Sequence, residues 1–226
     1  MPHLRTVQLY KTYWLDEIKI QSLIDINLSI EQGEFVAITG PSGSGKSTLL
    51  HLLGCIDTPT IGNVFIKEIN VSTLKANSIR ELRLRELGFV FQHFYLLPVL
   101  TAQENIELPM KEAGLPKLAR KQRTMELLDA VGLRDRANHM PGQLSGGEQQ
   151  RIAIARALAN NPSIILADEP TGELDSANGR MILELLTHIN KEYGKTVIVV
   201  THDDSLARQA TRIIKLHDGR IVSDVR

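Results

Sequence analysis

Gly40-Pro41-Ser42-Gly43-Ser44-Gly45-Lys46-Ser47-Thr48 satisfies the pattern GxxxxGK[ST] of a phosphate-binding loop. The run lies between an apolar stretch at residues 35–38 and a helical apolar run at residues 49–53, which is the context that such a loop requires. Its glycines let backbone N–H groups approach phosphate oxygens closely. We therefore expect all nine residues to line a bound nucleotide, with Lys46 on the β and γ phosphates and Ser47 on Mg²⁺.

The composition is that of a globular chain. With 226 residues, 42% of them hydrophobic, the chain can build one sizeable core with or without an appended subdomain. Lys plus Arg and Asp plus Glu both number 26, so no net positive field attracts nucleic acid or an anionic membrane. Apolar runs such as residues 197–200 are far shorter than the roughly 20 residues that cross a bilayer. A single cysteine, Cys55, and residues 1–5 without a signal-peptide pattern favour the cytosol.

Two kinds of strand are predicted. Ile24, Ile26, Leu28 and Ile30 alternate with polar residues, which is typical of an antiparallel strand with one face in solvent. Three continuous apolar runs, at residues 35–38, 164–167 and 197–200, are typical of strands covered on both faces in a parallel sheet. Asp218-Gly219 between two apolar pairs indicates a late hairpin. The predicted fold class is α/β, with a parallel core and an antiparallel subdomain near the N-terminus.

A helical insertion is expected at about residues 93–160 of a single domain that spans residues 1–226. Apolar residues recur there at helical spacing and basic residues fill the other side of the helix. The apolar set is Leu118, Met125, Leu128 and Val131, and the basic set is Lys117, Arg120, Lys121 and Arg123. The apolar segment 93–100 allows two interpretations: packing within the helical part, or a groove that receives a short helix of a membrane subunit.

Polar residues follow the predicted core strands. Asp168 and Glu169 end one apolar run, where Asp168 could hold Mg²⁺ through water and Glu169 could deprotonate an attacking water. Gln92 follows residues 88–91 and could ligate Mg²⁺ and sense the γ-phosphate, while His202 could hydrogen-bond the γ-phosphate and the water. Taken singly, each has a plainer interpretation as a surface-turn, loop or core polar residue. In combination with the phosphate loop they indicate a catalytic edge of the sheet.

The stretch Leu144-Ser145-Gly146-Gly147-Glu148-Gln149-Gln150 narrows the class of nucleotide-binding protein. Ser145 and Glu148 form a capping box, so a helix should begin here, bury Ile152 and Ala155, and stop near residue 160. Helix capping alone would explain Ser145 and Glu148. It leaves the two glycines between them unexplained.

The complete set of motifs resembles the ATPase subunit of an ATP-binding cassette (ABC) transporter. The resemblance runs nearly end to end and keeps the order of the family's motifs. These are Tyr13, the phosphate loop, Gln92, Leu144 to Glu148, Asp168-Glu169, Leu174-Asp175 and His202. The resemblance implies a RecA-like parallel-sheet core with an antiparallel β subdomain and a helical subdomain. It also implies ATP and Mg²⁺ as ligands and ATP hydrolysis as the activity.

By this resemblance, Ser145, Gly146 and Gly147, in the motif that Glu148 completes, contact the γ-phosphate on the loop of a second subunit. Two ATP molecules would then lie between two head-to-tail copies of the chain. A phosphate ligand suits a capped helix N-terminus, because the free backbone amides and the partial positive charge there favour binding of an anion.

Tyr13 is implied to stack on adenine, although Tyr10 and Trp14 are nearby competitors and an aromatic beside a strand is often only packed. ATP is preferred over GTP, because Asn190-Lys191-Glu192 is followed by Tyr193 and the guanine-reading pattern Asn-Lys-x-Asp is therefore absent from the sequence.

Several further runs resemble the subgroup that serves lipoprotein-releasing and macrolide-exporting systems. They are Gly54 to Asp57, Leu108-Pro109, Ala167 to Gly172 and Asp175-Ser176. Glu173 departs from the pattern, since small or amide residues are commoner there, and it adds negative charge near the expected dimer seam. The expected partners are a second copy and an integral membrane permease subunit, with the chain peripheral on the cytoplasmic face of the membrane.

The sequence leaves three rival functions open. A cell-division ABC ATPase would signal across the membrane without transport. A soluble ABC protein acting on ribosomes or DNA usually carries two cassettes or a coiled-coil insertion, and neither is evident in the sequence. A plain phosphotransferase would gain nothing from Leu144 to Glu148.

Overall fold

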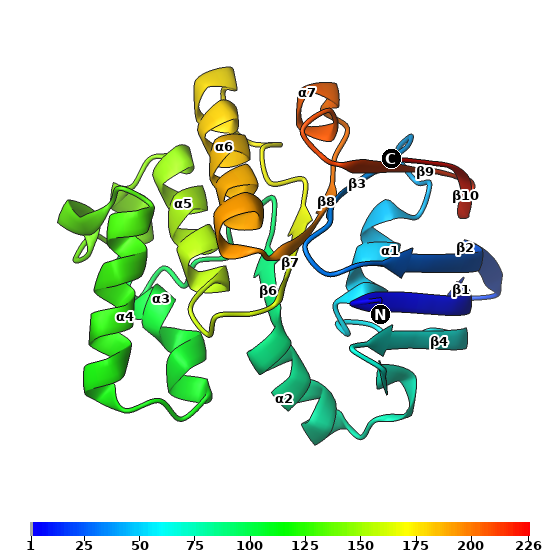
Figure 1. Cartoon of the computed structure of the whole chain (residues 1–226), viewed down its shortest axis with the longest axis horizontal. Coiled ribbons are helices and arrows are strands. Elements are labelled where there is room, and N and C mark those ends of the chain that lie inside the picture. Colours follow the sequence, from blue (N-terminus) through cyan, green and yellow to red (C-terminus); the bar gives the residue numbers. More distant parts are fainter. Residues whose placement is uncertain (1) are drawn as a thin grey trace.

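The chain forms two sheets that share a helix-covered core (Figure 1). The computed structural model describes residues 2–226, without the side chains of residues 204 and 205. No helix in this described part is long and apolar enough to span a membrane.

The larger sheet has the order β10-β9-β3-β8-β7-β6. Its strands are β3 (Phe35–Thr39), β6 (Leu87–Val90), β7 (Ile164–Asp168), β8 (Thr196–Val200), β9 (Arg212–His217) and β10 (Arg220–Val225). All neighbours are parallel except β9 and β10, which form the predicted hairpin around Asp218-Gly219. Because parallel strands end at one edge, the segments after β3, β6, β7 and β8 meet there.

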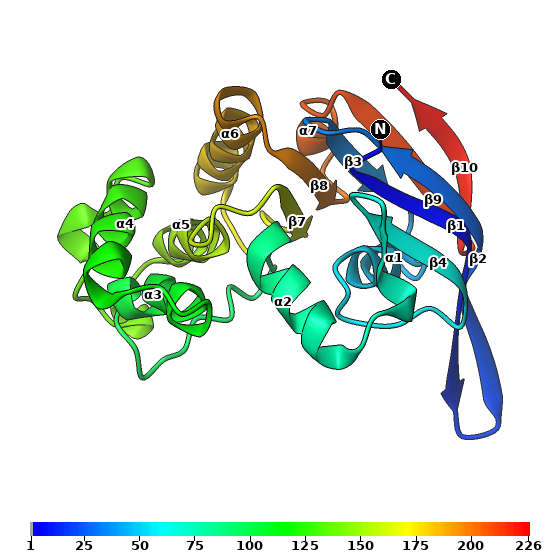
Figure 2. The ribbon, with the colours of Figure 1, turned by 60° about the horizontal axis from the view of Figure 1, so that its bottom comes forward.

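The smaller sheet is antiparallel, in the order β2-β1-β4-β5. It comprises β1 (Leu4–Leu15), β2 (Ile18–Ile30), β4 (Ile61–Ile66) and β5 (Ile69–Asn70). The predicted alternation is right for Ile26, Leu28 and Ile30, which are buried, and wrong for Ile24, which is only partly buried. A bulge with a positive φ of 52° at Asp25 shifts the register, so Leu23 enters the core instead. Figure 2 shows the β1–β2 hairpin extending beyond the rest of the molecule.

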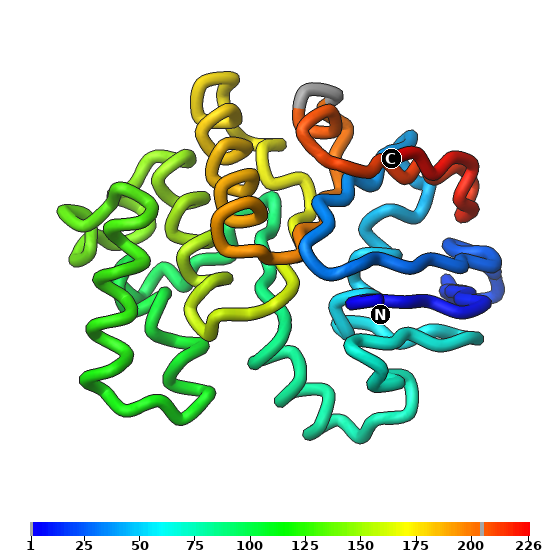
Figure 3. Tube along the Cα trace, viewed as in Figure 1, coloured from blue at the N-terminus to red at the C-terminus, as the bar shows by residue number. Residues whose placement is uncertain are grey.

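Seven α-helices and three 3₁₀ turns are found among the described residues. The α-helices are α1 (Lys46–Leu53), α2 (Ala76–Glu86), α3 (Ala102–Glu112), α4 (Lys117–Ala130), α5 (Gly146–Ala157), α6 (Ser176–Tyr193) and α7 (Asp204–Ala207). The 3₁₀ turns are η1 (Val71–Thr73), η2 (Arg134–Arg136) and η3 (Pro141–Gln143). The trace in Figure 3 leaves the parallel sheet after β6, passes through α3, α4 and α5, and returns at β7.

Two positions of α4 differ from the amphipathic pattern. Leu118 is 81% exposed, because it lies in the first turn, beyond the part of the helix that packs through Leu127 and Leu128. Arg120 was expected in solvent but is largely covered: its Nη1 donates to the carbonyl of Leu115 at 2.6 Å. A long side chain can bury its stem while its charged head finds a partner, which periodicity does not register.

The parallel strands are covered on both faces. Phe35, Ala37, Val197 and Val199 enter a core with Ile152 of α5 and Ile182 of α6. The alternate residues of β3 and β8 enter a second core with the leucines of α1 and the inner face of β2. Double coverage therefore explains why the runs at residues 35–38 and 197–200 are continuously apolar.

Candidate nucleotide-binding site

The loop at residues 40–48 joins β3 to α1 and places backbone amides at the start of that helix. Gly45 is the N-cap of α1 with a φ of 97°, and no side chain caps the helix there. Ser44 Oγ is buried and, among the described atoms, has no hydrogen-bond partner. An uncapped helix N-terminus beside an orphaned hydroxyl suits an anion, so the loop fits the phosphates of a nucleotide.

Lys46 lies folded back over this loop. Its Nζ donates to the carbonyl oxygens of Gly40 at 3.0 Å and Pro41 at 2.9 Å. The side chain is therefore already held over the loop, where its charge is available to phosphate oxygens.

Ser47 and Asp168 are brought together from opposite ends of the sequence. Ser47 Oγ donates to Asp168 Oδ1 at 3.1 Å. Two oxygen donors are a suitable set for Mg²⁺, which usually keeps several waters and takes its other ligands from phosphates. No cluster of three or more His, Cys, Asp or Glu side chains suited to a metal occurs in the described part of the chain.

The charge state of Asp168 depends on its neighbours. Burial raises the pKa of Asp168, and the hydrogen bond from Ser47 together with the nearby His51 and Lys46 partly offsets that rise. His51 Nε2 lies 3.9 Å from Asp168 Oδ2. A cation at this carboxylate would offset the same burial, which agrees with a metal-holding role.

Glu169 and His202 lie in hydrogen-bond contact although they follow different strands. His202 Nδ1 is 2.7 Å from Glu169 Oε2. Glu169 has a φ of 46°, and its N–H donates to the carbonyl of Val200 at 2.9 Å. A left-handed backbone at a non-glycine residue is strained, and such strain concentrates at functional sites.

The segment after β6 lies against the segment after β7. A Cβ on Gly172 would stand 3.1 Å from Gln92 Nε2, so Gln92 packs on that glycine. His93 Nδ1 lies 2.5 Å from Glu173 Oε1. Glu173, whose charge was unexpected from the subgroup pattern, therefore has a partner within its own chain.

Tyr13 is held in place by Asp57, a residue to which the sequence analysis gave no role. Tyr13 Oη donates to Asp57 Oδ2 at 2.8 Å, and Lys11 Nζ, 4.7 Å from the centre of the Tyr13 ring, is also bound to Asp57. Burial, followed by the bond to Asp57, raises the pKa of Tyr13. The sequence signals for this contact were weak: a basic residue, Lys11, two positions before Tyr13, and an acidic residue, Asp57, three positions after Gly54.

The Ser145 to Glu148 segment lies elsewhere, at the start of α5. The predicted capping box is present: Glu148 N–H donates to Ser145 Oγ at 3.3 Å and Ser145 N–H to Glu148 Oε2 at 2.8 Å. Glu148 Oε1 also accepts from Arg136 Nε at 3.1 Å. The nearest side chains to Gly146 are Leu174 and Phe94, not residues of the phosphate loop.

Packing within the chain also explains why a glycine stands at position 147, and the sequence analysis missed this. A Cβ there would stand 2.1 Å from Asn178 Oδ1 and 3.1 Å from Asn178 Cβ on α6, so a larger residue would have to displace the Asn178 side chain. Asn178 Nδ2 in turn donates to Asp175, the N-cap of α6, at 2.8 Å.

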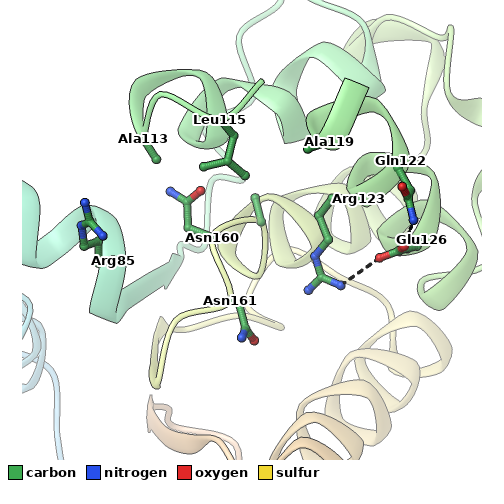
Figure 4. A pocket seen from close by; sticks show the side chains of 10 residues that line it. Arg85, Ala113, Leu115, Ala119, Gln122, Arg123, Glu126, Asn160 and Asn161 are labelled. Carbon is green, nitrogen blue, oxygen red and sulfur yellow. Dashed lines mark hydrogen bonds and ion pairs between the residues drawn. The ribbon is translucent and has the colours of Figure 1, made fainter. Parts of the chain in front are cut away.

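A separate cavity of about 470 Å³ opens between α2, α4 and residues 159–161 (Figure 4). Its arginines have acidic neighbours: Arg123 is 3.3 Å from Glu126, and Arg85 is 3.1 Å from Glu81. None of its described lining residues belongs to the predicted nucleotide site.

Comparison with known proteins gives consistent matches. A family model described as ABC transporter matches residues 23–172. An ABC transporter ATP-binding protein of Thermotoga maritima is 54% identical over 215 residues, covering 95% of this chain and 92% of that protein. The macrolide export ATP-binding/permease protein MacB of Brucella abortus is 51% identical over 223 residues, which cover 99% of this chain. The chain spans only 34% of the length of that MacB protein.

Among solved structures, the ATP-binding cassette MJ0796 of Methanocaldococcus jannaschii is similar throughout. Its dimeric structure, a post-hydrolysis state bound to ADP and Pi, matches with a TM-score of 0.92 and 49% identity, over 99% of this chain and 98% of that one.

Proposed function

The chain belongs to the ABC transporter family and is an ABC-type ATPase, and we propose that two copies of it close head to tail around two ATP molecules. In this proposal each site takes its phosphate loop from one copy and the Ser145 to Glu148 segment from the other. Hydrolysis then reopens the pair.

One observation carries the proposal. The capped start of α5 offers backbone amides to an anion, yet its nearest neighbours are Leu174, Phe94 and Asn178 rather than its own phosphate loop. A second chain must therefore supply the phosphate that these amides bind. The relative MJ0796, at 49% identity, was solved as a dimer with ADP and Pi.

Residues at the sheet edge would divide the work as follows. Lys46 binds the terminal phosphates, and Ser47, Asp168 and Gln92 hold Mg²⁺, which supplies positive charge to the transferred phosphoryl group. Glu169 accepts a proton from the attacking water, and His202 orients that water and the γ-phosphate. The contact between His202 and Glu169 keeps the proton acceptor in a fixed direction.

A membrane permease subunit is the proposed partner. An open groove of about 540 Å³ runs beside the segment after β6. Its lining is mainly apolar, with Phe89, Phe91, Tyr95, Leu108 and Pro109, and with arginines at 80, 83 and 156. Within segment 93–100, Leu96 packs against the core, whereas Tyr95 lines the groove and is 60% exposed, which supports a groove open to a partner at that residue.

The membrane process is proposed to be of the macrolide-export or lipoprotein-release type, with the chain held on the cytoplasmic face by its permease. The MacB relative of Brucella abortus, named as an ATP-binding/permease protein, supports the export type. A cell-division ATPase that signals without transport is the alternative. Identifying the membrane protein that co-purifies with the chain would decide between them.

A mixing experiment tests the shared site. Lys46→Ala damages the phosphate loop and Ser145→Arg damages the capped helix end, so each homodimer should be inactive. In a mixture, heterodimers regain one intact site, and random pairing predicts about a quarter of wild-type turnover. A mixture as inactive as its components would refute the shared site. So would a wild-type turnover per subunit that does not rise with protein concentration.

A further inference from the structure

Gln150 lies in the interior of the molecule between three functional segments. It stands on α5, five residues after Ser145, and its residue surface is 0% exposed. Its Nε2 donates to the carbonyl of Pro170 at 2.6 Å and to the carbonyl of Phe91 at 3.3 Å. One amide group thus contacts the segment that carries Glu169 and the segment that carries Gln92.

The other end of this amide argues against a purely packing role. Gln150 Oε1 is buried and finds no hydrogen-bond partner among the described atoms. An apolar side chain of similar length would fill the space without leaving an acceptor unsatisfied. The donor end is therefore what an amide adds at this position.

The two segments that Gln150 joins already contact each other. Gln92 packs on Gly172, and His93 pairs with Glu173. Arg156, also on α5, donates from Nη2 to the carbonyl of Phe94 at 2.7 Å. Helix α5 therefore holds the segment after β6 at two points, and Gln150 extends that hold to the segment after β7.

Pro170 transmits the contact directly to Glu169. The two residues share a peptide bond, and Glu169 is fixed on its other side by the bond from its N–H to the carbonyl of Val200 at 2.9 Å. A carbonyl held at Pro170 limits rotation of the strained Glu169 backbone, whose φ is 46°.

We propose that Gln150 is a positioning residue that couples the anion-binding start of α5 to the proton acceptor Glu169. The proposal rests on the proposed function, because it takes the start of α5 to meet the partner's ATP. When that end of the helix is drawn toward the partner, the amide moves Pro170 and Phe91 with it. Glu169 and Gln92 then reach their working positions together.

Gln150→Met tests the bridge, since methionine keeps the length and unbranched shape but donates no hydrogen bond. Asn190→Leu on α6 is the matched control. Asn190 is also a buried amide whose Nδ2 joins two carbonyls, those of Gly33 and Lys195, each at 2.8 Å. Both carbonyls lie at the amino ends of strands, away from the site.

We expect Gln150→Met to lower kcat roughly tenfold to a hundredfold while KM for ATP changes less than about twofold. Asn190→Leu should show a comparable fall in Tm with kcat within about twofold of wild type. If Gln150→Met does not fold, Gln150→Ala gives the same comparison, because it removes the amide without adding bulk.

Equal losses of kcat in the Gln150 and Asn190 variants would overturn the bridge, since both would then report only lost stability. That result would leave the shared site untouched. A mixture of Lys46→Ala and Ser145→Arg chains that stays as inactive as its components would instead overturn the shared site, whatever Gln150→Met shows.

Discussion

His202 Nδ1 lies 2.7 Å from Glu169 Oε2, although the two residues stand 33 positions apart and follow different strands. Their side chains differ in environment: that of Glu169 is 18% exposed and that of His202 is 73% exposed. A partly buried carboxylate can accept a proton from water, and the imidazole beside it keeps that carboxylate in a fixed orientation. The pair is the geometric basis for the first prediction.

Glu169→Gln should retain ATP binding and stop hydrolysis, because the amide keeps the shape but accepts no proton. We expect turnover to fall by about 10²- to 10⁴-fold. An ATP-bound dimer should accumulate and elute earlier in size-exclusion chromatography. Lys46→Ala is the control, since it should neither bind ATP normally nor dimerise with it. A monomeric and fully active Glu169→Gln variant would refute the assignment of Glu169 as base.

Tyr13 should contribute through its ring rather than its hydroxyl. Lys11 lies over one face, so a base would stack on the other. Tyr13→Ala should weaken ATP binding about tenfold, because stacking on a base contributes roughly 1–3 kcal/mol. Tyr13→Phe loses the bond to Asp57 but keeps the stack, and should bind ATP within about threefold of wild type. Titration with a fluorescent ATP analogue measures both, and equal losses would point to the hydroxyl instead.

The acid limb of Mg²⁺-dependent activity should reflect Asp168. Burial raises the pKa of Asp168, so protons compete with the metal at a pH above the usual range for an aspartate. Charge on His51 opposes that rise. His51→Gln should therefore raise the pKa of Asp168 further and move the acid limb to higher pH. Profiles of kcat/KM against pH at several Mg²⁺ concentrations check this, and a shift to lower pH would contradict it.

Arg212 should stabilise the fold independently of the site. It is 7% exposed and donates to Asp224 Oδ1 at 2.7 Å, to Glu34 Oε2 at 3.0 Å and to the carbonyl of Ser29 at 2.7 Å. Arg212→Met should lower the free energy of unfolding by about 2–3 kcal/mol at neutral pH, since the partners are partly solvated.

The pH dependence of that loss has a definite sign. The hydrogen bond from Arg212 lowers the pKa of Asp224. The stability that this ion pair contributes is therefore fully present above the unfolded pKa of about 3.9. It disappears as the pH falls through the lower folded pKa. Urea unfolding at pH 7 and below pH 4 should show the gap between wild type and Arg212→Met narrowing in acid. A constant gap would assign the loss to packing.

Local patterns predicted much of the fold. Continuous apolar runs at residues 35–38 and 197–200 indicated strands covered on both faces, and alternate residues do enter two cores. Ser145 and Glu148 predicted the start of α5, and Asp218-Gly219 predicted the β9–β10 turn. These features depend on neighbours in sequence, which a pattern can read.

Predictions failed where a contact or a bulge outside the regular spacing of one element decides the outcome. Leu118 fits the apolar spacing of α4 but projects beyond the helices that would cover it. Arg120 fits the polar side but is drawn in by the carbonyl of Leu115. Ile24 lost its place in the core to Leu23 through a bulge at Asp25. Periodicity describes one element and carries no information about its edges or its partners.

Spacing along the chain was enough to predict the phosphate loop, the strand that precedes it, the helix that follows it, and the capped start of α5. Folding in three dimensions sets which groups meet: Ser47 with Asp168, Glu169 with His202, Tyr13 with Asp57, and Gln150 with Phe91 and Pro170. Parallel strands bring their carboxyl ends to one edge, and this joins the segments that carry Ser47, Gln92, Asp168, Glu169 and His202. The separation of these residues in sequence carries no pattern that would predict their contacts.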